Sequence, residues 1–309
     1  MKELSIVIPL FNEKANLNSL YSLLKPVMEK LNKEYELIFV DDGSTDNSFS
    51  ILENFHNKDK TVKVIQFRRN FGKSAALSAG FKHAKGKVVI TMDADLQDDP
   101  REIPNFIKKL DEGYDIVSGW RFKRRDSFSK TFPSKLFNYL TSILTGIKIH
   151  DFNCGFKACK RKIIEDINIY GELHRYIPVF AYWKGYKVGE IKVKHHLRGG
   201  GKSKYGLERL FRGFTDLLTV MFLTKYAKKP LHLFGAIGIL LFLIGLIINI
   251  YLFIIKLLGE SIGDRPLLLL GVLLIVIGFQ IISTGLIGEM IVATRNKTDE
   301  DYIIRRVLE

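Results

Sequence analysis

The chain has 309 residues, of which 47% are hydrophobic and 26% are charged, and this composition excludes a disordered or collagen-like protein. Residues 1–230 hold 41 of the 47 basic and 26 of the 33 acidic residues, a net charge of +15, whereas residues 231–293 hold only five charged residues. A basic polar domain followed by a nearly uncharged stretch excludes an ordinary soluble protein.

Segments typical of strands and helices alternate along the first 118 residues. Apolar runs that predict strands cover residues 4–10, 36–40, 62–67, 87–92 and 116–118. Helical patterns between them cover residues 15–31, 47–55, 73–84 and 103–110. The alternation predicts an α/β fold, in which βαβ units build a mostly parallel sheet with helices on both faces. Ligands of such sheets bind beyond the carboxyl ends of the strands, so we expect the functional residues directly after the strands.

Acidic residues cluster directly after three of the predicted strands. Residues 9–13 follow the first strand, residues 41–46 the second and residues 93–98 the fourth, and each segment contains carboxylates. The Asp-Gly-Ser of the second segment is by itself ordinary turn chemistry. Three such clusters at one edge of a sheet, in a domain of net charge +15, predict a common binding site.

Asp93 and Asp95 are expected to point the same way, because side chains alternate along an extended chain. Two neighbouring carboxylates repel each other unless a cation lies close to both. Hard oxygen ligands suit Mg²⁺ or Mn²⁺, and either ion would also bind a diphosphate. We therefore predict a divalent metal ion here, the alternative being two helix-capping aspartates before Pro100.

Two segments have the pattern of helices that lie on a membrane surface. Residues 205–226 carry apolar side chains at helical spacing with basic residues beside them, which fits a helix bound to an anionic leaflet. Residues 132–149 have a similar pattern, and packing against the core explains it equally well.

Two long apolar runs follow and predict a two-helix transmembrane hairpin. Residues 233–255 contain no charged residue over 23 positions. As a helix this run would be about 35 Å long, enough to cross a hydrocarbon core about 30 Å thick. Residues 267–288 form a second uncharged run. No ionisable group lies inside either run, which argues against an ion pump or carrier.

The expected domain organisation follows from these segments. Residues 1–203 form a cytosolic catalytic domain, 204–230 an interfacial region, 231–293 two transmembrane helices and 294–309 a cytosolic tail. Basic residues flank both runs, so the positive-inside rule predicts an inner (plasma) membrane protein with both termini in the cytoplasm. We expect no export signal before the first strand and expect Cys154 and Cys159 to be reduced.

The strand-end motifs, together with Asn70-Phe71-Gly72-Lys73, resemble those of glycosyltransferase family 2, whose members have the GT-A fold. The polyprenyl-phosphate branch, with its dolichol-phosphate mannose synthases and bactoprenol glucosyltransferases, is the most similar. The segments that carry this narrower resemblance are residues 151–156, residues 198–205 and the apolar hairpin. The resemblance covers nearly the whole chain.

The resemblance implies a role for each motif. The residues that would bind the nucleotide sugar are Pro9, Asn12, Glu13, Asp41 and Asp93. The metal ion, Mg²⁺ or Mn²⁺, would be bound by Asp95 and Asp93 together with Gln97. Arg121 would be a catalytic arginine of the active site, Arg198 and Lys204 would hold phosphates there, and Asp151 is the candidate catalytic carboxylate. Lys73 lacks the earlier glycine of a P-loop, and we expect it to begin a helix near the nucleotide.

The implied reaction moves one sugar, with UDP-glucose as our expected donor, to polyprenyl (undecaprenyl) phosphate with inversion. The Gln-x-x-Arg-Trp motif of processive synthases does not occur in the sequence, which favours single-sugar transfer. Relatives that assemble through their membrane parts suggest a homo-oligomer, and no nucleic-acid partner is expected.

Three alternatives remain open at this stage. The acceptor could be another lipid such as diacylglycerol, whose hydroxyl would need a true base. The chain could instead be a non-enzymatic, basic, membrane-anchored binding protein, or a scaffold that helps a flippase. Neither non-enzymatic alternative explains the acidic clusters.

Overall fold

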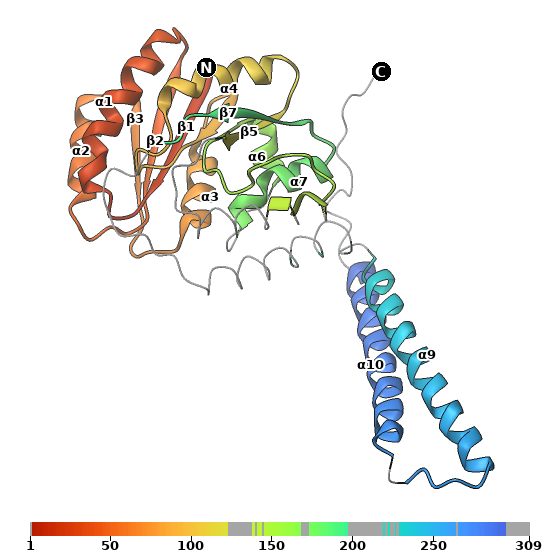
Figure 1. Cartoon of the computed structure of the whole chain (residues 1–309). Coiled ribbons are helices and arrows are strands. Elements are labelled where there is room, and N and C mark those ends of the chain that lie inside the picture. The colour runs from red at the N-terminus through yellow and green to blue at the C-terminus, as the bar shows by residue number, and fades with distance from the viewer. Residues whose placement is uncertain are drawn as a thin grey trace. The chain divides into compact units, whose positions relative to one another are not determined.

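The computed structural model describes residues 2–122, 138–139, 141–143, 145–167, 173–196, 219, 222, 226, 229–263 and 265–294. The chain divides into two compact units, Met1–Leu217 and Leu218–Glu309 (Figure 1). Arg198, Lys204, most of residues 205–226, residues 132–137, 140 and 144, and the tail after residue 294 lie outside the described residues.

One seven-stranded sheet forms the centre of the described part of the first unit. Its strands are β1 (Leu4–Leu10), β2 (Tyr35–Asp41), β3 (Val62–Gln66), β4 (Val88–Thr91), β5 (Ile116–Arg121), β6 (Lys157–Lys160) and β7 (Val188–Val193). They lie in the order β3-β2-β1-β4-β6-β5-β7, and β6 runs antiparallel to both of its neighbours while the other pairs are parallel. The prediction of a mostly parallel sheet is confirmed.

The strands β6 and β7 were not predicted. The four residues of β6 begin and end with lysine, and β7 contains a glycine and two charged residues, so neither has the apolar run of a buried strand. Both are strands because the sheet provides partners: β6 fills the space between β4 and β5, and β7 pairs with β5 at the edge. Pairing with neighbouring strands, rather than local sequence, therefore determines that these two segments form strands.

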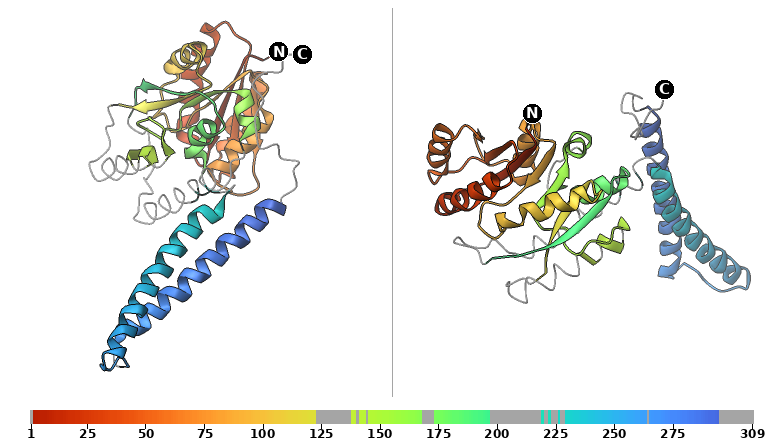
Figure 2. Two further views of the ribbon diagram at one scale, coloured as in Figure 1. Left: turned by 90° about the vertical axis from the view of Figure 1, so that its right-hand side faces the viewer. Right: turned by 90° about the horizontal axis from the view of Figure 1, so that it is seen from above.

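Helices cover both faces of the sheet, as Figures 1 and 2 show. On one face, α1 (Lys14–Lys30), α2 (Ser48–Lys58) and α4 (Ile103–Asp111) pack over the first hydrophobic cluster. On the other, α3 (Lys73–His83), α6 (Arg161–Asp166) and α7 (Ile177–Trp183) pack over the second. Two short 3₁₀ helices, η1 (Pro100–Glu102) and η2 (Leu173–Tyr176), precede α4 and α7.

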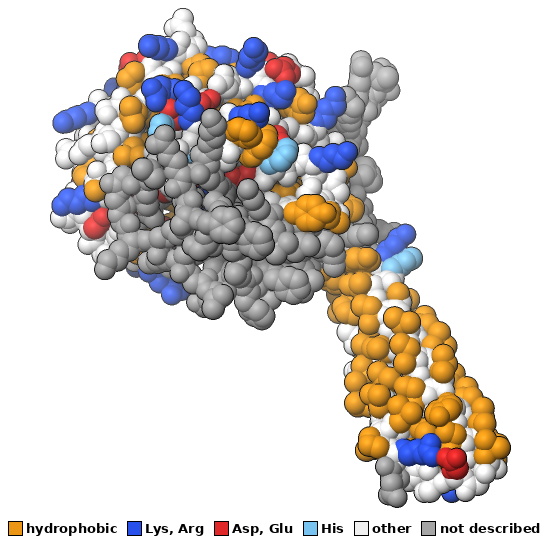
Figure 3. Space-filling model, viewed as in Figure 1, with side chains coloured by type: hydrophobic (Ala, Val, Ile, Leu, Met, Phe, Trp, Pro, Cys, Tyr) orange, Lys and Arg blue, Asp and Glu red, His pale blue; other side chains and the backbone are white. Residues whose placement is uncertain are grey.

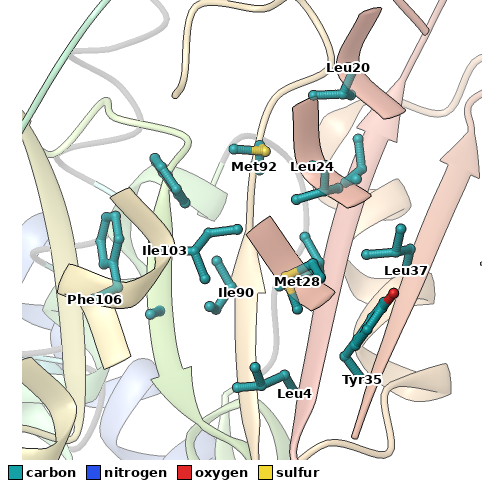
Figure 4. Packing of buried hydrophobic residues seen from close by; sticks show 14 of the residues in the cluster. Leu4, Leu20, Leu24, Met28, Tyr35, Leu37, Ile90, Met92, Ile103 and Phe106 are labelled. Atoms are coloured by element: carbon teal, nitrogen blue, oxygen red, sulfur yellow. The ribbon is translucent and has the colours of Figure 1, made fainter. Parts of the chain in front are cut away.

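The helix α1 shows why this arrangement forms. Leu17, Leu20, Leu24 and Met28 recur every three or four residues, so they share one face of the helix, and all four are fully buried. Figure 4 shows Leu20, Leu24 and Met28 packed toward the strands. β1 is buried on both faces, because Ile6 and Ile8 lie in one hydrophobic cluster while Val7 lies in the other.

The second unit contains two long helices, α9 (Pro230–Leu257) and α10 (Pro266–Thr294). Both are long and apolar enough to cross a membrane. Figure 3 shows that the surface of these two helices consists almost wholly of hydrophobic side chains, with charged side chains at the turn that connects them. Two of the polar side chains bond within their own helix: Asn249 Nδ2 donates to the carbonyl of Gly245 at 2.8 Å, and Thr284 donates to that of Gln280.

Glycines set the distance between these two helices. A Cβ atom on Gly238 would lie 2.6 Å from the carbonyl oxygen of Gly278, and one on Gly245 would lie 2.6 Å from that of Gly271. The two backbones therefore approach more closely than side chains would permit, as small-residue interfaces allow in membrane helices.

We predict that Gly278→Leu separates α9 from α10. Its Cβ would lie 2.7 Å from the backbone of Gly238 and Phe242, atoms that cannot move independently of their helix. The free energy of unfolding should fall by about 1–3 kcal/mol, as for overpacked interiors, measured in detergent by circular dichroism during titration with SDS. Gly263→Leu, in the connecting turn where no heavy atom lies within 4 Å, is the control and should change little.

Candidate active site

A pocket of about 330 Å³ lies beyond the carboxyl ends of β1, β2 and β4. It is lined by Pro9, Leu10, Phe11, Glu13, Asp42, Asn70, Gly72, Lys73, Ala76, Asp93, Ala94 and Asp95. The pocket therefore brings together Pro9, Glu13, Lys73, Asp93 and Asp95, five of the residues singled out from the sequence.

Asn12 and Asp41 do not line this pocket but fix the loops that do. Asn12 has φ 57°, and its Oδ1 accepts a hydrogen bond from the backbone N–H of Thr45 at 2.8 Å. Asp41 Oδ1 accepts from the N–H of Ser44 at 2.9 Å. Asp41 is completely buried, and its Oδ2 meets no hydrogen-bond partner among the residues that the structure describes. This carboxylate therefore keeps one acceptor for another group.

Asp42 has a positioning role that the sequence analysis missed. Its two carboxylate oxygens accept from the backbone N–H groups of Phe71 at 2.7 Å and Gly72 at 2.9 Å. Gly72 has φ 93°, a conformation that favours glycine, and it is the N-cap of α3. Burial raises the pKa of Asp42 despite these two bonds. The carboxylate thus holds the turn from which Lys73 enters the pocket.

Lys73 and Asp93 form an ion pair inside the pocket, between Nζ and Oδ1. Burial opposes ionisation of Asp93, but the positive charges of Lys73, Lys157 and Arg121 outweigh it and hold its pKa below the usual value. Asp93 is therefore ionised at neutral pH and able to bind a cation.

Gly155 allows the carboxylate of Asp93 to occupy its place. A Cβ atom on Gly155 would lie 2.6 Å from Asp93 Oδ2. Gly155 lies close to Asp93 because the pairing of β4 with β6 brings their two segments together. Thr91 pairs with Lys157 across these strands, and Thr91 Oγ1 donates to the carbonyl of Gly155 at 2.7 Å. This explains the glycine of the Cys-Gly-Phe segment, whose role the sequence did not reveal.

The two aspartates of the predicted metal site lie together for a different reason from the one expected. β4 ends at Thr91, the chain bends at residues 94–96, and Leu96 has φ 64°, so strand alternation does not apply. Asp95 Oδ1 accepts from the backbone N–H of Gln97 at 3.2 Å. Both aspartates still line the pocket.

The donor atoms of the pocket fit Mg²⁺ or Mn²⁺ that is shared with a substrate. Among the described residues, no group of three His, Cys, Asp or Glu side chains could hold a metal ion by itself. Mg²⁺ is commonly bound by one or two carboxylates plus substrate phosphates. Asp93 and Asp95 supply such a pair, whereas Gln97 is absent from the pocket lining.

Arg121 and Asp151, both predicted to be catalytic, form a buried bidentate ion pair. Arg121 Nε donates to Asp151 Oδ2 at 2.7 Å and Nη2 donates to Oδ1 at 2.9 Å. Burial alone would lower the pKa of Arg121, but the charge of Asp151 outweighs it and raises that pKa. Asp151 Oδ1 also accepts from the backbone N–H of Asn153. Asp151 thus fixes the orientation of Arg121.

Two further buried ionisable groups lie beside Asp93. Asp98 Oδ2 accepts from the backbone N–H of Asp93 at 3.2 Å, and burial together with the charge of Asp93 raises the pKa of Asp98 to about 7. Lys157 donates to the carbonyl oxygens of Cys154 and Phe152, and burial lowers its pKa to about 8. Neither was predicted, although the acidic run at residues 98–99 could have drawn attention to Asp98.

The segment before Arg198 pairs with the segment after Asp95. His195 forms an isolated β-bridge with Asp98, and the N–H of His196 donates to the carbonyl of Gln97 at 3.0 Å. His196 Nε2 lies 3.1 Å from Asp99 Oδ2. The two residues His195 and His196, which precede the segment 198–205, are therefore tied to the residues directly after Asp95.

Comparison with known proteins identifies the family. The model of glycosyl transferase family 2 matches residues 5–168. A dodecaprenyl-phosphate galacturonate synthase from Rhizobium johnstonii is 39% identical, with 99% of this chain and 93% of that protein covered. The chain belongs to glycosyltransferase family 2. An undecaprenyl-phosphate 4-deoxy-4-formamido-L-arabinose transferase from Shewanella sediminis is 38% identical over 93% of this chain and 86% of its own length.

Solved structures support the fold. Glucosyl-3-phosphoglycerate synthase from Mycobacterium tuberculosis, in complex with phosphoglyceric acid, superposes with a TM-score of 0.55 at 17% identity, covering 72% of this chain and 80% of that one. Another structure of that enzyme contains Mn²⁺, uridine diphosphate and phosphoglyceric acid, with 72% and 78% covered and the same TM-score and identity. The expected GT-A fold is confirmed, and this family-2 glycosyltransferase adds the apolar hairpin α9–α10 to it.

We predict that Gly155→Ala impairs this glycosyltransferase without unfolding it. The new methyl group must displace the carboxylate of Asp93, and a displacement of about 1 Å at a reacting centre lowers activity about 10²-fold. The measurement is kcat/KM together with the melting temperature. Gly263→Ala is the control, and activity of the Gly155 variant within threefold of wild type would contradict the prediction.

We predict that Asp98→Asn stabilises the enzyme at alkaline pH. The pKa of Asp98 is about 7 in the folded chain and about 3.9 when unfolded, so its contribution is favourable only while the carboxyl is protonated. That contribution is lost as the pH rises from about 4 through 7. Asparagine can still accept from Asp93 N–H, so the variant should gain about 1–3 kcal/mol at pH 8 and almost nothing at pH 4.

Denaturant unfolding at both pH values measures this gain, with the exposed Asp111→Asn as the control. An Asp98→Asn variant whose advantage stays constant from pH 4 to pH 8 would show that the carboxyl does not titrate in this window.

Proposed function

We propose that this glycosyltransferase moves one sugar from a nucleotide sugar to the phosphate of a polyprenyl phosphate, with inversion at the anomeric carbon. The observation that carries the proposal is the 39% identity over 99% of the chain, the apolar hairpin included, to a relative whose name states a dodecaprenyl-phosphate product. Other relatives at 35–38% identity are named for undecaprenyl phosphate.

On the donor side, Asp93 and Asp95 would hold Mg²⁺ or Mn²⁺ on the diphosphate. Such an ion, when bound, would supply stabilisation for the negative charge that develops on the departing nucleoside diphosphate. Lys73 and the first turn of α3 add positive charge on the same side of the pocket. Pro9 and Glu13 line the pocket and would contact the nucleotide, while Asn12 and Asp41 hold the adjoining loop and Asp41 keeps an acceptor for the base.

On the acceptor side, a phosphate monoester has a second pKa of roughly 6 and is already largely dianionic at neutral pH. Such a nucleophile needs no strong base, which agrees with an Asp151 whose two oxygens accept from Arg121. A guanidinium has five N–H donors, and among the described residues Arg121 uses two of its nitrogens on Asp151, so its other N–H groups could bind a phosphate. Arg198 and Lys204 would supply the remaining positive charge around the two anions.

The membrane part of the proposal follows from the acceptor. The phosphate of a polyprenyl phosphate stays at the leaflet surface, so the enzyme must work there. We propose that α9 and α10 cross the inner membrane and that the catalytic domain and both termini lie in the cytoplasm, where nucleotide sugars are available.

The sugar is open to a direct experiment. The relatives are named for galacturonate and for 4-deoxy-4-formamido-L-arabinose, so UDP-glucose is one of three donors to compare. Full-length enzyme in detergent would be given each UDP-sugar, Mg²⁺ or Mn²⁺ and a short polyprenyl phosphate. We expect an acid-labile sugar phosphate in the lipid extract with at least one donor; a product formed only on diacylglycerol would refute the proposed acceptor.

Asp95→Asn tests the metal-binding role in the same assay. Removing one of two carboxylates from the diphosphate site should lower kcat by about 10²–10³-fold, the usual effect of losing one transition-state stabilising group. Chelation with EDTA should abolish turnover of the wild type. Asp111→Asn, an exposed change on α4, is the control. Full activity of Asp95→Asn, or of the wild type in EDTA, would contradict the metal-dependent mechanism.

A further inference from the structure

The ion pair between Lys73 and Asp93 uses the same carboxylate as the proposed metal ion. Lys73 Nζ contacts Asp93 Oδ1, and both residues line the donor pocket. A lysine ammonium and a divalent cation repel each other and cannot both lie close to one carboxylate at full strength. Binding of a metal ion to Asp93 therefore competes with the contact between Lys73 and this carboxylate.

The geometry allows the ammonium group of Lys73 to move away from Asp93. The side chains of Lys73 and Asp93 are 32% and 34% exposed, so the pair is partly solvated and weak compared with a buried one. The backbone of Lys73 is fixed, because Asp42 holds Phe71 and Gly72 at the start of α3. Four flexible carbons separate that fixed point from the ammonium group, so the charge can move while the helix stays in place.

The new position of the ammonium group follows from charge. A nucleoside diphosphate brings negative oxygens into the same pocket, and an ammonium group has three donors for them. Asp93 would then be available to hold the metal ion. Each of the two cations would then lie beside an anion.

We propose that Lys73 is a positioning residue that takes the place of the metal ion on Asp93 in the free enzyme and transfers to the diphosphate when the donor binds. The inference rests on the proposed function, because it assumes that the donor is a nucleoside diphosphate sugar. Before the donor arrives, Lys73 holds one oxygen of the Asp93 carboxylate, whose other oxygen lies against Gly155.

Two opposite effects of one substitution follow. Lys73→Met removes a competitor for Asp93, so Mn²⁺ alone should bind about threefold to fivefold more tightly, as expected for loss of a partly exposed ion pair. The same variant lacks the cation that receives the diphosphate, so UDP in EDTA should bind about tenfold more weakly. Damage to the fold would weaken the binding of both Mn²⁺ and UDP. Only the loss of a competitor would strengthen the binding of Mn²⁺ while that of UDP becomes weaker.

The experiment uses the full-length enzyme in detergent at pH 7.5. Free Mn²⁺ is measured by electron paramagnetic resonance, UDP binding by calorimetry and folding by thermal melting. Lys73→Arg keeps the charge and should bind Mn²⁺ like the wild type. Lys109→Met, which breaks a 2.7 Å surface ion pair with Glu112, is the control for losing a lysine.

Unchanged or weaker Mn²⁺ binding by a folded Lys73→Met variant would overturn the inference, and so would unchanged binding of UDP. Unchanged Mn²⁺ binding by Asp93→Asn would overturn it as well, because Asp93 would then not be a ligand. If Lys73→Met binds Mn²⁺ more tightly and UDP more weakly, but the enzyme transfers no sugar to polyprenyl phosphate, the result would support the inference and refute the proposed acceptor. Sugar transfer without the opposite shifts would refute the inference alone.

Discussion

Carboxylates gather at the carboxyl end of this sheet, and their mutual repulsion must be compensated for the site to exist. The negative charges of these carboxylates are compensated in different ways. Asp42 accepts two backbone N–H groups, Asp93 pairs with Lys73 and Asp151 pairs with Arg121. Burial and the charge of Asp93 raise the pKa of Asp98 to about 7, so this carboxyl is only partly ionised at neutral pH. The acidic site is therefore stable within a domain of strongly basic composition, and cations close to it are part of its construction.

The sequence predicted the rim of the pocket because the relevant signals are local. A strand that ends in acidic residues places them at the edge of a parallel sheet, whatever the rest of the chain does. Glu13, Asp93 and Asp95 were found in this way, and all three line one pocket together with Pro9, which the family resemblance indicated. The expected alternation of Asp93 and Asp95 was nevertheless the wrong reason, since the chain bends after β4. Local pattern located the residues but not their conformation.

The residues that sequence reasoning missed are defined by pairing between distant segments. Gly155 lies against Asp93 because β6 enters the sheet antiparallel to β4, and nothing in the four residues of β6 predicts that strand. Arg121 and Asp151 were each singled out, but their ion pair spans 30 positions and depends on the order of β5 and β6. In α9 and α10, hydropathy predicts the helices, whereas the contact of Gly238 with Gly278 depends on their register.

The two ion pairs of the site differ in exposure, and this difference suits two different tasks. Asp151 is 3% exposed and bound by two nitrogens of Arg121, so breaking this pair would leave a buried charge without compensation. Such a pair is a fixed part of the framework. Lys73 and Asp93 share one contact and are each about one-third exposed, so water can replace either partner at small cost. A fixed pair can orient a cation throughout the reaction, whereas an exchangeable pair can accept a metal ion and a diphosphate that arrive and leave in every cycle.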